Sequence, residues 1–243
     1  MEKNNEQLIS FLHEPDNAWV TPIIPASKAL PDWYKRLPVR TEELQPWDAA
    51  TVKSCMPFFD AMVQGYVMPL WADLHVKTES TKKGNPSPTF TWGIYGDTVV
   101  ERHTPLQTGE MPAMEESLGH SGAFKIMSPW IIKTPPGYSS LFIAPLNNSP
   151  KYMNFVSAIV STDSYNNYIN FPFIWTGPED WTGIISQGTP IIQIIPFKRV
   201  NFKHEVRAFN ASEDWSVRST ARALRNAFTH TYKRLWRKPT RSV

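Results

Sequence analysis

Short apolar runs separated by turn residues fill the middle of the chain. Between residues 66 and 202 these runs are rich in Val, Ile, Phe and Trp, with Gly, Pro, Asn and Asp between them. β-Branched and aromatic residues favour strands, and short strands at this spacing without helical periodicity are typical of all-β sandwiches and barrels. The pattern predicts a mainly β core domain over residues 51–209.

The C-terminal segment changes to a helical period. Its apolar residues recur every three or four positions, which is the pattern of one stripe of an amphipathic helix. Asn210 or Ser212 can cap the start, and two acidic residues in the first turn complement the helix dipole. We expect one amphipathic, basic helix over residues 210–238. Its stripe consists of Val217, Ala221, Leu224, Phe228, Tyr232 and Leu235.

The first fifty residues follow neither period. Segment 21–40 has a proline every few residues, which favours extended backbone. One short helical turn is expected near residues 31–34, and a short helix over residues 57–64 ends at Gly65. We predict an irregular N-terminal arm over residues 1–50 that covers the flank of the β core, so that the chain forms a single globular unit.

Composition narrows the class of protein. Cys55 is the only cysteine, which excludes an intramolecular disulfide and favours an intracellular protein; we expect this thiol to be a small buried hydrophobe. No apolar run approaches the length of about 18 residues that a membrane span needs. Ten tryptophans and 22 prolines indicate large flat apolar surfaces and rigid connections.

The most basic part of the chain is the predicted terminal helix. Eight Lys and Arg residues and no acidic residue follow Asp214, whereas the formal net charge of the whole chain is +3, so the remainder is acidic. This basic face is either only solvated or meets nucleic acid, an anionic membrane or an acidic protein surface. The candidate partner-binding residues are Arg218, Arg222, Arg225, Arg234 and Arg237.

One turn has apolar runs on both sides. In "WIIKTPPGYSSLFIAPLNNSP", residues 130–150, Pro136 presets the backbone of a turn and Gly137 can take the positive φ of a type II turn. Two interpretations are open. The segment is either a structural hairpin within the β core or the frame of a small-molecule site.

Three segments come in an order found in a known superfamily. They are "PPGYSSLFIAP", "AIVSTDSYNNYINFPF" and "ISQGTPIIQIIPFKR", which lie between about residues 130 and 200. Their order resembles that of the dUTPase and dCTP-deaminase superfamily, in which a Pro-x-Gly-Tyr turn, an acidic turn with an aromatic residue and a Gly-x-x-x-x-Gln strand follow one another. The resemblance implies a β-clip or jelly-roll-like sandwich core with a nucleotide-binding cleft.

The chain departs from that superfamily where the chemistry takes place. Residues 146–149, Leu-Asn-Asn-Ser, match the position of an Arg-Ser-Ser phosphate clamp but contain no cation, and neutral amides replace arginine poorly at phosphate. The position of the superfamily's catalytic aspartate is occupied here by Ser161 or Thr162, depending on the alignment. In the first case Asp163 lies further along the same face of the strand, and in the second it lies on the opposite face. We therefore predict no catalytic residue. The ligand-binding candidates that the resemblance leaves are Asn147, Asn148, Ser149, Asp163, Tyr165 and Gln193.

A second resemblance spans most of the chain. The segments "LPDWYKRLP", "KSCMPFFDAMVQGY", "KTPPGYSSLF" and "GTPIIQIIPFKR", with the Thr-Asp turn, resemble an uncharacterised family of tailed bacteriophages and some bacteria. This resemblance implies a phage or phage-like origin and carries no activity with it.

Two functions from different classes follow. The first is a non-enzymatic phage-encoded interaction protein, a virion structural or assembly component that binds other phage subunits or copies of itself as a homo-oligomer. Nucleic acid is a further candidate partner of the basic C-terminus, and no membrane is expected. Such a protein resides in the host cytoplasm or in the virion. The alternative is a nucleotide-binding or nucleotide-processing protein with a dUTPase-like cleft.

The remaining polar residues offer little chemistry. Asp73 with His75 and Glu101 with His103 lie two residues apart in predicted strands, so each pair shares a face and can form a carboxylate–imidazole dyad. We interpret them as polar outer faces of half-buried strands. The polar loop that follows, with Gln107, Glu110, Glu115, Glu116 and His120, is expected to be solvated. We predict no metal site and no cofactor.

Overall fold

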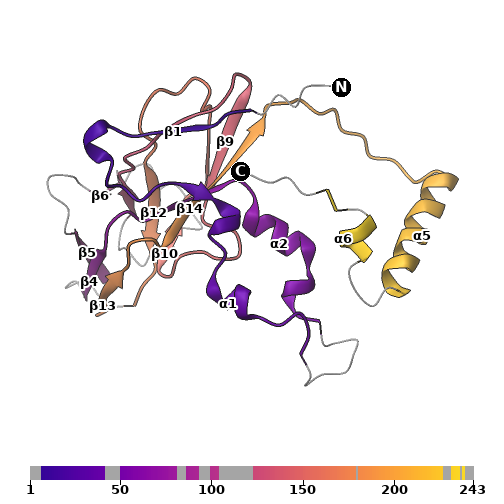
Figure 1. Ribbon diagram of the computed structural model, residues 1–243, viewed down its shortest axis with the longest axis horizontal. Coiled ribbons are helices and arrows are strands. Elements are labelled where there is room, and N and C mark those ends of the chain that lie inside the picture. The colour runs from indigo at the N-terminus through magenta and orange to yellow at the C-terminus, as the bar shows by residue number, and fades with distance from the viewer. Residues whose placement is uncertain are drawn as a thin grey trace.

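The chain is mainly β, as its apolar pattern predicts: strand accounts for 34% and helix for 21% of the computed structural model. The structure describes residues 7–41, 50–80, 86–92, 99–103, 123–178, 180–226, 231–235 and 237–238. Figure 1 shows the strands gathered on one side of the molecule and the last helices on the other.

The described strands form antiparallel sheets of two, three, four and five strands. The five-stranded sheet has the order β11-β9-β14-β3-β2, with β11 at Ala158–Val160, β9 at Tyr138–Ile143, β14 at Pro190–Lys198, β3 at Tyr66–Pro69 and β2 at Ile24–Pro25. Strand β14 pairs along both edges, with Gln193 opposite Val67 of β3 and opposite Ile143 of β9. This strand is the centre of the sheet.

The other sheets pack around the same core. The four-stranded sheet has the order β10 (Met153–Phe155), β12 (Phe171–Trp175), β7 (Ala123–Ile126) and β6 (Val100–Arg102). The three-stranded sheet joins β13 (Thr182–Ile185), β4 (Leu74–Ser80) and β5 (Pro86–Trp92), and β1 (Ser10–Leu12) pairs with β8 (Ile131–Lys133).

Aromatic and branched side chains from several sheets make one core. The ring of Phe90 lies 4.9 Å from that of Phe124 and 5.7 Å from that of Phe173, in edge-to-face contact. Ile192 and Ile194 of the central strand are fully buried in the same cluster. Each such side chain contributes about 1.5–3 kcal/mol by leaving water, so the alternating apolar residues of the strands account for the burial of the sheets.

The N-terminal segment is part of the sheets rather than an arm beside them. Strand β1 pairs with β8 and strand β2 pairs with β3, which gives this segment backbone hydrogen bonds to the core. Between and after these strands lie short helical elements: η1 Pro15–Asn17, η2 Ala26–Lys28, α1 Asp32–Arg36, η3 Val52–Ser54 and α2 Met56–Val63. The expected helical turn near residues 31–34 and the helix ending before Gly65 are both confirmed, as α1 and α2.

The turn at residues 135–138 has the predicted backbone but does not close a hairpin. Gly137 has φ 83°, and the Tyr138 N–H donates to the Pro135 carbonyl at 3.2 Å. However, β8 before the turn pairs with β1, and β9 after it lies between β11 and β14. The hairpin prediction is wrong because both edges of β9 are taken by other strands, and the turn carries the chain from one sheet to another.

The segment expected to form one helix over residues 210–238 holds two described helices, α5 (Ala211–Asn226) and α6 (Thr231–Leu235). Residues 227–230 between them lie outside the described part of the chain. The start of α5 is capped on both sides: the Asn210 side chain accepts from the Glu213 N–H at 3.0 Å, and the Glu213 carboxylate accepts from the Asn210 N–H at 3.0 Å.

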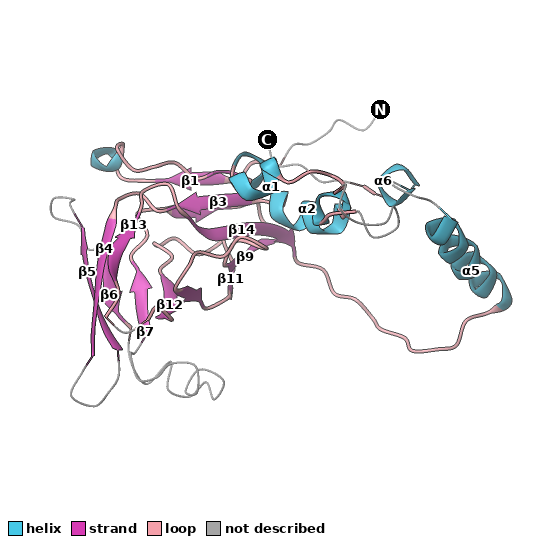
Figure 2. Cartoon of the chain, turned by 90° about the horizontal axis from the view of Figure 1, so that it is seen from below, coloured by secondary structure: helices cyan, strands magenta, loops and turns pink. Residues whose placement is uncertain are grey.

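Figures 1 and 2 show α5 standing apart from the sheets, at the end of an extended linker that leaves β14. The linker comprises residues 199–210. We call residues 199–243, which begin with the linker and contain both helices, the C-terminal extension.

Gly65 is predicted to be the most sensitive glycine of the described chain. It has φ 69°, and a Cβ added there would lie 2.1 Å from the backbone oxygen of Ile194 in the central strand. We expect Gly65→Ala to lower the free energy of unfolding by more than about 3 kcal/mol, because backbone strain of about 1–3 kcal/mol adds to a clash that the strand cannot relieve.

Gly137→Ala is the matched control. It has a similar φ of 83°, but a Cβ there meets no atom within 4 Å, so only the backbone strain remains. Urea denaturation of both variants beside the parent measures the difference. Equal losses of stability at the two positions would contradict the close approach of Gly65 to β14.

Candidate functional site

Gln193, a candidate ligand-binding residue, is used inside the fold. Its side chain is 1% exposed. The amide nitrogen donates to the carbonyls of Ala61 at 2.9 Å and Gln64 at 2.7 Å, and the amide oxygen accepts from the Leu146 N–H at 2.8 Å. Gln193 therefore satisfies the last carbonyls of helix α2 and holds the loop after β9, and both N–H donors of its buried amide are already used within the fold.

Asp163 is likewise engaged by the protein. Arg199 donates to both carboxylate oxygens, through Nη1 at 3.0 Å to Oδ1 and through Nη2 to Oδ2, and the Gly137 N–H donates to Oδ2 at 2.9 Å. The Arg199 guanidinium, followed by the Gly137 N–H, holds the pKa of Asp163 at about 2, below its ordinary 3.8. Arg199 also donates to the Tyr138 carbonyl at 2.7 Å, so this ion pair joins the turn before β9 to the end of β14.

The described hydrogen bonds of residues 147–149 are those of a turn and not those of a phosphate clamp. Asn147 has φ 58°, the Asn148 N–H donates to the Pro145 carbonyl at 3.1 Å, and the Ser149 hydroxyl donates to the same oxygen at 3.5 Å. These are the contacts of a tight turn, in which asparagine tolerates the left-handed backbone.

The predicted ligand-binding residues do not come together at one site. Asp163 lies at the Tyr138 end of β9, whereas Gln193 and the 147–149 loop lie at its Ile143 end. Six residues of strand separate these ends by about 17 Å. Tyr165 is 42% exposed and lines a different hollow. The structure therefore brings the six residues to three separate places.

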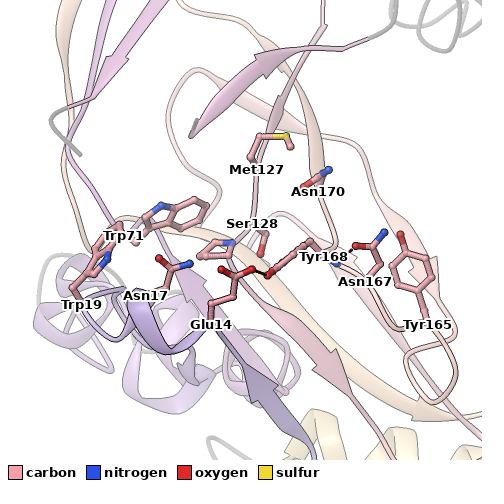
Figure 3. Close-up of a pocket in the computed structure, with 11 residues that line it drawn as sticks. Glu14, Asn17, Trp19, Trp71, Met127, Ser128, Tyr165, Asn167, Tyr168 and Asn170 are labelled. Carbon is pink, nitrogen blue, oxygen red and sulfur yellow. Dashed lines mark hydrogen bonds between the residues drawn. The ribbon is translucent and has the colours of Figure 1, made fainter. Parts of the chain in front are cut away.

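That hollow has a volume of about 490 Å³ (Figure 3). Three parts of the chain form it: residues 14–19 with Trp71, the connection 127–129 between β7 and β8, and residues 165–170 before β12. A hydrogen bond between side chains of different segments holds its walls. The Tyr168 hydroxyl donates to the Glu14 carboxylate, which joins two lining residues that are 154 positions apart in the sequence.

The lining of the hollow is aromatic and amide-rich. Figure 3 shows Trp19 and Trp71 on one side and Tyr165 on the other, with Asn17, Glu14 and the Tyr168 hydroxyl between them. The hydrogen bond to Glu14 raises the pKa of Tyr168. Sequence reasoning did not single out this set, although "EPDNAW" and "SYNNYIN" concentrate aromatic and amide residues in two short stretches that the fold brings together.

The C-terminal extension is a second candidate surface. The described side chains of its linker are exposed, as is much of α5. Val217, Tyr232 and Leu235, which belong to the predicted apolar stripe, are 47%, 40% and 55% exposed, so these residues do not pack on the β core. Within the described residues no helix is both long and apolar enough to cross a membrane.

The candidate partner-binding arginines differ in how they are used. Arg237 donates to both oxygens of Asp60 in α2, with Nε at 2.9 Å from each, and lies over the Phe59 ring; its assignment to a partner surface is corrected to an internal anchor. Arg218 is paired with Asp214 one turn earlier at 2.7 Å, and Arg222 and Arg234 make no ion pair with any described residue. The side chain of Arg225 lies outside the described residues.

The acid–histidine pairs do not form dyads. The Asp73 carboxylate accepts from the Gln187 N–H at 2.7 Å, and Glu101 pairs with Lys125 at 3.0 Å. Burial and the charge of Lys125 lower the pKa of His103. Among the described residues no three Cys, His, Asp or Glu side chains cluster as metal ligands; the polar loop with Gln107, Glu110, Glu115, Glu116 and His120 lies outside them.

Cys55 also differs from expectation. It is exposed at the start of α2 rather than buried as a small hydrophobe, and the buried residues of this helix, Met62 and Val63, lie at its other end.

The Asp163–Arg199 pair generates a prediction on acid stability. Because the folded-state pKa of Asp163 is depressed, its stabilisation is complete above the unfolded value of about 3.9 and is lost as pH falls toward about 2. We expect Asp163→Asn to lower the melting temperature at pH 7 and to flatten its fall between about pH 4 and pH 2.

Asp32→Asn is the control for this prediction, because Asp32 forms an exposed pair with Lys35 at 3.2 Å and closes no turn. Thermal melts of both variants across pH provide the measurement. If the melting temperature of Asp163→Asn falls between about pH 4 and pH 2 as steeply as that of the parent, the turn does not depend on this carboxylate.

Comparison with known proteins adds no family assignment. A scan against protein-family models finds no matching family, and a search of curated proteins finds no match to the chain.

Proposed function

We propose that this chain is a non-enzymatic interaction protein, a virion structural or assembly component encoded by a phage, which joins copies of itself through the C-terminal extension. The observation that carries this proposal is the exposure of large apolar side chains along the linker and α5. Phe202 is 87%, Val206 93%, Phe209 65% and Trp215 74% exposed.

Apolar exposure of this kind needs a covering surface. Isolated surface hydrophobes are common, but a run of large ones on an extended segment is typical of a protein–protein contact, and aromatic residues are enriched at the energetic centres of such contacts. The linker and α5 lie away from the sheets in both views, which supports a covering surface on another molecule (Figures 1 and 2).

Charge favours a second copy as that molecule. Residues 199–243 contain 11 Lys and Arg and three Asp and Glu, a formal charge of +8, whereas residues 1–198 contain 14 and 19, a formal charge of −5. Opposite charge on the two parts favours contact between the extension of one copy and the body of the next. Such a head-to-tail contact closes into a ring or continues as a filament, which suits an assembly component.

Two ion pairs anchor the extension to its own body. Arg199 with Asp163 fixes the point where the linker leaves β14, and Arg237 with Asp60 fixes the return to α2. The Arg237 and Asp60 side chains are 10% and 30% exposed, so solvent screens this second pair less than a surface pair. Anchoring at both ends limits the positions that α5 can take, so less conformational entropy is lost when it docks.

The finer fold and origin are part of the same proposal. The three segments that resemble the dUTPase and dCTP-deaminase superfamily lie side by side, as β9, β11 with its following turn, and β14, which supports a β-clip or jelly-roll-like core. The wider resemblance to a family of tailed bacteriophages supports a phage origin and a place in the host cytoplasm or the virion. The alternative is a nucleotide-processing protein. The described contacts of Asp163 and Gln193 do not favour it, because both side chains are hydrogen-bonded to other parts of the chain.

The apolar part of the contact is tested by a triple substitution, Phe202→Asp, Val206→Asp and Phe209→Asp. We expect the free energy of unfolding to stay within about 0.5 kcal/mol of the parent, because these side chains are exposed in the single chain. Analytical ultracentrifugation over a concentration series should show an oligomer for the parent and a monomer for the variant.

Ile184→Asp is the matched control, since Ile184 is 52% exposed on the edge strand β13, where a charge is tolerated. It should leave self-association unchanged. A parent protein that stays monomeric at every concentration, or a triple variant that assembles as well as the parent, would refute the proposed contact.

The electrostatic part is tested by Arg222→Glu with Arg234→Glu. Both side chains are exposed and lack a described ion-pair partner, so charge reversal should leave folding intact and weaken self-association at low salt. The difference should vanish at about 1 M salt, where the Debye length is about 3 Å.

Lys151→Glu is the control for the electrostatic test, because the same kind of charge reversal is made on the body instead of the extension. Lys151 is an exposed cation of the body, so its reversal makes the body more acidic and should leave association unchanged or tighter at low salt. Equal weakening by both sets of variants would show that the contact does not join a basic extension to an acidic body.

A further inference from the structure

We propose that the hollow lined by residues 14–19, Trp71, 127–129 and 165–170 binds a neutral saccharide. The hollow does not involve the C-terminal extension, so this inference is independent of the proposed assembly function. Its volume of about 490 Å³ falls within the range of about 300–1,000 Å³ that small-molecule sites occupy.

The first argument is the accessibility of its aromatic faces. Trp19 is 46% and Tyr165 is 42% exposed although both line a concave surface, whereas Trp71 beneath them is buried at 3%. The C–H face of a sugar ring packs on such aromatic rings through apolar contact and weak C–H hydrogen bonds. The two exposed rings stand on opposite sides of the hollow in Figure 3, so that each side offers an aromatic face to a saccharide.

The second argument is the kind of polar group between those rings. Asn17 and Asn170 line the hollow, are partly buried, and make no side-chain hydrogen bond to any described residue. An amide both donates and accepts, and so does a sugar hydroxyl, so each amide can satisfy adjacent hydroxyls in both directions. Because these two amides are only partly buried, a sugar hydroxyl can reach them and take the place of water as their hydrogen-bond partner.

The third argument is the charge of the lining. Among the described residues that line the hollow there is no Lys or Arg, and Glu14 is the one carboxylic acid, with its carboxylate accepting from the Tyr168 hydroxyl. Arg and Lys make the strongest side-chain hydrogen bonds to phosphate, so a lining without a described cation favours a neutral ligand over a nucleotide. A purely apolar ligand does not fit either, because it would cover the Asn17 and Asn170 amides without giving them a hydrogen-bond partner.

The walls are fixed before any ligand binds. Val20, next to Trp19, is buried and its N–H donates to the Asn17 carbonyl at 3.0 Å. On the opposite wall, Ile169 is buried beside Tyr168, whose hydroxyl holds the N-terminal segment through Glu14. A preformed site loses less entropy when it binds, which suits the weak individual contacts that sugars make.

The test uses the full chain and defined probes. Intrinsic tryptophan fluorescence and saturation-transfer NMR are recorded with methyl α-glucoside, methyl β-galactoside, N-acetylglucosamine and maltotriose, followed by an array of bacterial and eukaryotic glycans. Adenosine and tetramethylammonium serve as the rival neutral-planar and cationic probes. We expect saturable binding of at least one saccharide, with neither rival bound.

Two variants assign that binding to the hollow. Trp19→Ala and Asn170→Ala should each raise the dissociation constant for the bound saccharide about tenfold or more. Trp33→Ala is the matched control, because Trp33 in α1 is 43% exposed but does not line the hollow, and it should bind as the parent does. Circular dichroism checks that each variant is folded.

Binding of no saccharide on the panel or the array would overturn the proposal, as would binding of adenosine or tetramethylammonium alone. Saccharide binding that survives both Trp19→Ala and Asn170→Ala would also overturn it, because the site would then lie elsewhere. None of these outcomes bears on self-association, which depends on the C-terminal extension.

Discussion

Strand β14 has to be buried on its faces and paired along both edges, and the rest of the structure is arranged around that requirement. Its residues Ile191, Ile192 and Ile194 are fully buried, and β9 and β3 supply its two sets of backbone hydrogen bonds. Gln193 stands among these isoleucines, where an unpaired amide would cost about 1–3 kcal/mol. The end of helix α2 and the loop after β9 meet at this strand because their backbone groups satisfy that amide.

The same principle explains why the polar residues of the three dUTPase-like segments serve the fold. The Thr162 hydroxyl is fully buried and lies 2.7 Å from that of Thr134 and 3.0 Å from that of Ser140. The neighbouring Asp163 ties the turn before β9 to Arg199 at the end of β14. In a low-dielectric interior such networks are stable when every group is satisfied, so a ligand that used these residues would have to break bonds that hold the sheet together.

The two proposed surfaces use different physics. The C-terminal extension presents apolar rings and cations on an extended segment, a combination that suits a large, salt-sensitive protein contact. The hollow presents amides and aromatic faces with no cation among its described lining residues, a combination that suits a small neutral ligand. The extension and the hollow share no described residue, so substitutions in one test one proposal without altering the other.

The sequence by itself determined the features that depend on neighbouring residues. The mainly β character, the short helix before Gly65, the positive φ of Gly137 and the Asn210–Glu213 cap all follow from contacts within a few positions. The tertiary structure decided which strands pair, and so replaced the expected hairpin at residues 130–150 with a passage between two sheets. It also brought Glu14 to Tyr168 and Asp60 to Arg237, across 154 and 177 residues. Periodicity records that a face is buried or that a turn occurs, but the partner that buries a face is chosen by long-range packing, which no local pattern contains.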